Sequence, residues 1–111
     1  MSRRDELVQK YADDLEKLGK TVDMDLLQRC VEACGPSIYR ADSETVASSD
    51  PDEIARVKNS FLIKRLGLAD DEKLDRGMTA AIEEYGTSNR NKYRPVLYYL
   101  LAERFDAVSR V

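Results

Sequence analysis

The chain has 111 residues, of which 42% are hydrophobic and 35% charged, and this composition excludes a disordered polypeptide. Its length predicts a single domain, residues 1–111, whose core needs no disulfide or metal to hold it. The net charge of −3 argues against nucleic-acid binding, which depends on Lys and Arg neutralising phosphates. The chain has no histidine, which is the commonest general base and metal ligand, so we expect no metal, no cofactor and no catalytic residue.

No targeting or membrane segment is visible. The N-terminus has no apolar run of signal-peptide length, and no segment approaches the roughly 18 apolar residues of a membrane span. With two cysteines and no export signal, the expected location is the cytoplasm, and no membrane partner is expected.

The first two helices are predicted over 3–18 and 24–34. Both begin after a residue that favours an N-cap and end at a glycine, and apolar residues recur at helical spacing in the first. The caps and stops are Ser2, Gly19, Asp23 and Gly35. The second helix carries Cys30 and Cys34 on one face, which we interpret as small core side chains because two thiols cannot complete a structural zinc site.

The segment "SIYRADSETVASS" predicts a loop, with one helical turn near residues 44–47. A third helix follows, running from Pro51 to Leu66. Its start, "DPDE", predicts Asp50 as the N-cap and Glu53 as the partner that completes a capping box.

A fourth helix is predicted to begin after Asp70 or Asp71 and to end at Tyr85, with Gly77 marking a close crossing. The fifth covers about 91–106, or begins at Ser88 with a kink, because Pro95 fits only a first turn. Its stretch "PVLYYLLA" is apolar on all faces, which is typical of a helix surrounded by others.

The predicted fold is therefore an all-α bundle of about five helices with the C-terminal helix at its centre. The first two helices also echo the next two in their starts and stops. "LG" at 18–19 matches 66–67, and "E-x-x-G-x-S" at 32–37 matches 83–88. Two interpretations stay open: a pair of similar helical hairpins, or repeated use of the same capping residues.

A candidate anion site lies at the start of the last helix, in "TSNRNKYR". Free backbone N–H groups at a helix start favour an anion, and cations and hydroxyls gather there. The echoed loop "GPSIYR" offers further groups if the two loops converge. The candidate residues are Ser88, Arg90, Lys92, Arg94, Ser37 and Arg40. The alternative is that carboxylates of this same chain pair with these cations, or that the cations are solvent-exposed.

The stretches "CGPSIY", "NSFLIKRLGL" and "YGTSNRNKYRPVLYYLL" together resemble a family of small bacterial proteins classed as a domain of unknown function. The resemblance covers nearly the whole chain. It implies an all-helical bacterial protein and supplies no activity, cofactor or catalytic residue.

Two functions fit these observations. The first is a non-enzymatic structural or protein-interaction module with an unknown protein partner, or a homodimer formed through the apolar last helix. The second is a module that recognises a phosphorylated or carboxylated ligand at residues 87–94. Nothing in the sequence indicates a reaction, so an enzyme is the least supported of the three classes.

Overall fold

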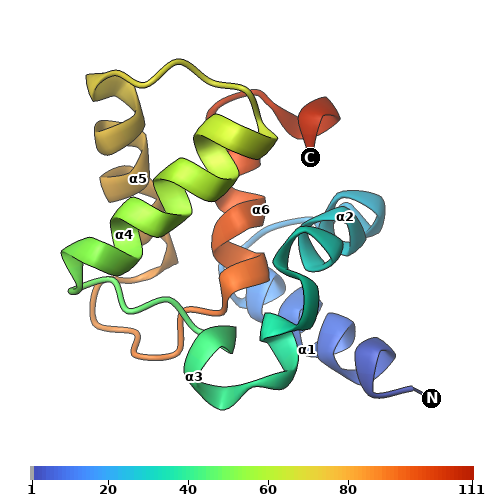
Figure 1. Ribbon diagram of the computed structural model, residues 1–111. Helices are drawn as coiled ribbons and strands as arrows, with labels where there is room; N and C mark the ends of the chain where they lie inside the picture. Colours follow the sequence, from blue (N-terminus) through green and yellow to red (C-terminus); the bar gives the residue numbers. More distant parts are fainter. Residues whose placement is uncertain (1) are drawn as a thin grey trace.

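Helices make up the architecture of residues 2–111, which the computed structural model describes and in which no strand occurs (Figure 1). The all-α class is confirmed. The elements are α1 Arg3–Lys17, α2 Met24–Cys34, the 3₁₀ turn η1 Gly35–Tyr39, α3 Ala41–Glu44, α4 Pro51–Val57, the π-helical η2 Lys58–Arg65, α5 Glu72–Tyr85, α6 Arg94–Arg104 and the 3₁₀ turn η3 Val108–Arg110. In this part of the chain no helix is long and apolar enough to cross a membrane.

Side-chain caps set the starts of four helices where the sequence predicts them. The Ser2 hydroxyl accepts a hydrogen bond from the Asp5 N–H at 3.1 Å, and Asp23 accepts one from Leu26 at 3.2 Å. Asp50 caps α4 and Asp71 caps α5, each by accepting a hydrogen bond from the N–H two residues later. Each cap satisfies a backbone donor that the helix leaves without an internal partner, so these boundaries are readable from local sequence.

Helix α6 is the centre of the fold. Every residue from Pro95 to Ala102 is buried, and the helix packs against α1, α2 and α5. Figure 1 shows it in orange behind α4, between α5 and α2. The predicted central position of this helix is confirmed.

The predicted start of the last helix at Asn91 is wrong, as is the alternative at Ser88, because α6 begins at Arg94. Tyr93 instead forms an antiparallel bridge with Thr45, so the chain before α6 is held in an extended course. Pro95 lies in the first turn, as predicted.

The predicted third helix is split into α4 and the π-helical η2. The Leu66 N–H bonds to the Phe61 carbonyl five residues earlier at 2.9 Å, which is the π pattern. The predicted capping box is also wrong. Asp50 accepts from the Asp52 N–H at 2.9 Å and donates its own N–H to a carbonyl in the preceding loop, which leaves Glu53 to face α6 instead. The helical turn expected near 44–47 occurs earlier, as α3.

Gly77 marks a close crossing, as predicted. A Cβ atom placed there would lie 2.1 Å from the Cζ atom of Phe105, which follows α6 directly. Pairs of helices adjacent in sequence pack together on either side of α6, α1 with α2 and η2 with α5. Whether the two pairs resemble each other in detail stays a prediction.

Candidate anion-binding hollow

Two loops that are far apart in sequence meet beside the start of α6. The Val46 N–H donates to the Lys92 carbonyl at 2.8 Å, next to the bridge between Thr45 and Tyr93. These contacts hold the Ser-rich segment 46–49 against the segment 87–92. The start of α6 is therefore shaped by a loop that precedes α4.

A hollow of about 270 Å³ lies between these loops, and we call it the Ser/Thr hollow. Its lining supplies four hydroxyl groups and two cationic side chains, and it includes no Asp or Glu. The lining residues are Val46, Ala47, Ser48, Ser49, Thr87, Ser88, Asn89, Arg90 and Lys92. The charged side chains of this lining are therefore all positive, although the chain has 21 acidic residues.

Lys92 is the buried cation of the hollow, with 2% of its surface exposed. Its ammonium group donates to the carbonyl of Thr87 at 3.2 Å and to that of Asn89. Within residues 2–111 no carboxylate lies within ion-pair distance of it. Burial therefore lowers the pKa of Lys92, because only neutral dipoles offset its charge.

Arg90 and Ser88 lie on the exposed side of the hollow. Arg90 makes no ion pair with any residue from 2 to 111. Three of the six candidate residues, Ser88, Arg90 and Lys92, are thus brought together at one surface.

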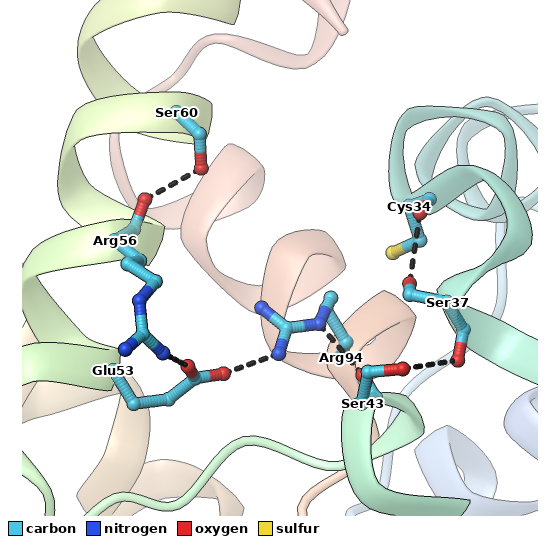
Figure 2. A network of polar contacts seen from close by, with 7 residues as sticks. All are labelled: Cys34, Ser37, Ser43, Glu53, Arg56, Ser60 and Arg94. Atoms are coloured by element: carbon cyan, nitrogen blue, oxygen red, sulfur yellow. Dashed lines mark hydrogen bonds and ion pairs between the residues drawn. The ribbon is translucent and has the colours of Figure 1, made fainter. Parts of the chain in front are cut away.

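Arg94 belongs to a different network, shown in Figure 2. Its guanidinium pairs with the Glu53 carboxylate from α4, and its Nε atom donates to the Ser43 carbonyl at 2.9 Å. Arg56 binds the other oxygen of Glu53 at 2.7 Å. Burial opposes the charge on Arg94, but its interactions with Glu53 and Tyr98 together outweigh burial and raise the pKa of Arg94.

Ser37 and Arg40 do not reach the hollow either. The Ser37 hydroxyl donates to the Cys34 carbonyl at 2.8 Å, and the Ser37 carbonyl accepts from the Ser43 hydroxyl at 3.2 Å (Figure 2). Arg40 is exposed and is not part of the lining. The loop "GPSIYR" therefore joins the network around Arg94, and the two predicted loops do not form one site.

A tyrosine hydroxyl fixes the wall of the hollow to the first helix. The Tyr85 hydroxyl accepts from the Tyr93 N–H at 2.9 Å and donates to the Asp14 carboxylate of α1. Burial, with the adjacent carboxylate, raises the pKa of Tyr85, so the hydroxyl keeps the proton that this arrangement needs. On the same side, the Lys10 ammonium lies 4.4 Å from the centre of the Tyr93 ring.

Sequence reasoning missed Ser48 and Ser49, which it assigned only to a loop. They lie near Ser88 because of the bridge between Thr45 and Tyr93. No local sequence pattern predicts a single isolated bridge. The available signal was "VASSD", a run of small and hydroxyl residues that ends at a helix cap.

The two thiols belong to the packed interior. Cys30 is fully buried and Cys34 half-buried, both are free, and burial raises the pKa of Cys30 to about 12. Between residues 2 and 111, no three Cys, Asp or Glu side chains converge in a way that could hold a metal ion. The prediction that both cysteines are core side chains is confirmed for Cys30 and holds in part for Cys34.

Comparison with protein families identifies the family to which the chain belongs. A family model described as a protein of unknown function, DUF2853, matches residues 10–109. The chain belongs to the DUF2853 family. The expected membership of a family of unknown function is confirmed, whereas a bacterial source stays an expectation. A search of curated proteins found no match.

Proposed function

We propose that this DUF2853 protein is a non-enzymatic module that binds a small oxyanion, such as a phosphate or carboxylate group, in the Ser/Thr hollow. One observation carries the proposal: two cations and four hydroxyls line a hollow from which acidic side chains are absent. Hydroxyl and cationic donors in a concave site are the groups that fix an oxyanion.

The charge on Lys92 supports the proposal. The Lys92 ammonium is buried against two carbonyls, so its positive charge has no neutralising partner within residues 2–111. An anion bound between Lys92 and Arg90 would supply that partner in a partly water-excluded position, where Coulomb attraction is stronger than in bulk water. Binding should therefore strengthen as salt is lowered.

The first test is titration of the protein with inorganic phosphate, followed by calorimetry and thermal unfolding. Phosphate at about ten times its dissociation constant should stabilise the folded protein by about 1.4 kcal/mol. Arg90→Ala should abolish most of this gain, because it removes the exposed cation of the hollow. The free energy of unfolding without phosphate should stay nearly unchanged, since Arg90 makes no ion pair between residues 2 and 111.

Arg40→Ala is the matched control. Arg40 is also an exposed arginine near a loop, but it lies outside the lining of the hollow. Phosphate binding that survives Arg90→Ala and is lost with Arg40→Ala would contradict the proposed site. Acetate and sulfate, titrated in parallel, rank carboxylates against tetrahedral oxyanions.

Protein interaction is the second candidate function, and it needs a surface other than α6. The apolar residues of α6 are buried within this chain, so they offer nothing to a second copy. A homodimer therefore has to use another face.

The cytoplasm is the compartment we propose, because both cysteines are free thiols.

A further inference from the structure

A run of basic residues follows the start of α4. Residues 54–69 contain Arg56, Lys58, Lys64 and Arg65 and no Asp or Glu, although the chain as a whole has 21 acidic residues. Lys58 is used internally, because it pairs with Asp70 and Asp75 on the α5 side. The other three cations remain on the outer side of the helix formed by α4 and η2.

Two of these cations, Arg56 and Lys64, line a groove of about 500 Å³, and we call it the basic groove. Its lining consists of Arg56, Asn59, Ser60, Ile63 and Lys64, which recur once per turn on one face of the helix. Arg56 lies at one end of this face and Lys64 at the other, and the aliphatic Ile63 lies beside Lys64. In Figure 1 the helix runs diagonally across the front of α6, and no other element lies in front of it.

The inner face of the same helix holds the groove in a fixed position. Phe61 and Leu62 are buried, and the Phe61 ring stacks on Tyr98 of α6 with 3.9 Å between ring centres. The Ser60 hydroxyl donates to the Arg56 carbonyl at 2.5 Å. The helix that carries the groove is therefore already in place when a partner binds, and only the exposed side chains have to be ordered.

We propose that the basic groove docks a short acidic segment of another protein, with an apolar side chain of that segment seated against Ile63. The Arg56 side chain is 69% exposed and has one carboxylate partner, Glu53. Lys64 is exposed and pairs with no carboxylate of residues 2–111. The two cations fit carboxylates spaced along a helix or an extended peptide.

The chemistry of the groove favours an acidic peptide over a nucleic acid. Phosphate backbones bind through many cations at once, and this chain carries a net charge of −3 that repels a long polyanion. The aliphatic contact at Ile63 suits a protein side chain. Charge complementarity at the rim should chiefly raise the association rate and make binding salt-dependent.

The test uses a fluorescein-labelled peptide of glutamates and leucines at helical spacing, beside a peptide with glutamine in place of glutamate. The wild-type protein should bind the glutamate peptide more tightly, with amide shifts centred on residues 56–64. Arg56→Glu combined with Lys64→Glu should weaken this binding about tenfold or more. Lys64→Glu alone should weaken it in part, and it breaks no ion pair within residues 2–111.

Arg3→Glu combined with Lys17→Glu is the matched control, because it changes the net charge equally at two exposed positions of α1. Equal losses in both double variants would overturn the proposal, as would equal affinity for the two peptides or no binding of either. Tighter binding of a single-stranded RNA at the same residues would also overturn it. Phosphate binding in the Ser/Thr hollow should survive both groove variants, so the two proposals fail separately.

Discussion

Arg94 and Lys92 lie two residues apart at the start of α6, yet their charges are compensated differently. Arg94 pairs with Glu53, a carboxylate 41 positions away, whereas Lys92 has only backbone carbonyls. A cation at the positive end of a helix is mildly unfavourable, and a buried carboxylate removes that cost at Arg94. The cation at the start of α6 thus has an internal partner, whereas Arg90 and Lys92 pair with no carboxylate of residues 2–111.

Gly77 is the residue at which one added methyl group should matter most. The Phe105 ring occupies the space that a Cβ would take, with three ring atoms within 3 Å of that position. Gly77→Ala should therefore lower the free energy of unfolding by about 1–3 kcal/mol through overpacking. Urea denaturation measures this change.

The double variant Gly77→Ala, Phe105→Leu is the control, because the smaller side chain should relieve most of the clash. Alanine is also a better helix former than glycine by about 1 kcal/mol. If Gly77→Ala alone were as stable as the wild type, the Phe105 ring would have to move aside freely, and the close crossing would have no energetic weight.

At the scale of elements, α6 and η2 show which parts of the fold local sequence can specify. The apolar stretch of α6 predicts its burial, because a helix with no polar face must be surrounded. The π-helical course of η2 has no such pattern, since Phe61 and Leu62 are buried equally well in an α-helical repeat. Phe61 of η2 stacks on Tyr98 of α6, and local sequence does not specify such a tertiary contact.

Leu100→Ala tests the central position of α6. Leu100 is 1% exposed, so truncation should remove its transfer free energy and leave a cavity, at a cost of about 2–5 kcal/mol. Met24→Ala is the matched control, because that side chain is 40% exposed. A denaturation midpoint that Leu100→Ala left unchanged would show that α6 is peripheral to stability.

The candidate site was predictable only in part, for the same reason. Arg90 and Lys92 could be identified because cations at a helix start are unusual, and Ser88 lies beside them in sequence. The ion pair between Arg94 and Glu53 could not be predicted, because the local sequence around Glu53 favours a capping box. Contacts between residues far apart in sequence place Arg94 outside the hollow and Ser48 and Ser49 inside its lining. A single sequence does not reveal such contacts.

At the scale of the whole molecule, buried thiols and tyrosine hydroxyls make the free energy of unfolding change with pH in the alkaline range. Burial raises the pKa of two thiols and four tyrosine hydroxyls above their ordinary values of 9.0 and 10.0. These groups are Cys30, Cys34, Tyr11, Tyr85, Tyr98 and Tyr99. They deprotonate in the unfolded chain but stay protonated in the fold, so above pH 9 the unfolded state binds fewer protons.

The free energy of unfolding should therefore be highest below pH 9 and fall as the pH rises through 10. Lys92 acts in the opposite direction, because its lowered pKa favours the fold as the pH approaches 10.5. It is one group against these six, and the raised pKa values of Lys20 and Lys58 act with the six. Urea denaturation at about pH 8 and about pH 10.5 measures the slope. Tyr98→Phe should make it shallower, and a stability that rose with pH would contradict the assignment.

The central place of α6 also bears on the order in which the protein can fold during synthesis. α1, α2 and α5 are all translated before α6, and they depend on it to cover their apolar faces. A nascent chain that stops short of Ala102 therefore exposes those faces to other nascent chains. Ribosome-bound intermediates should need chaperone protection until the last main helix emerges, and only then can these three earlier helices pack around it.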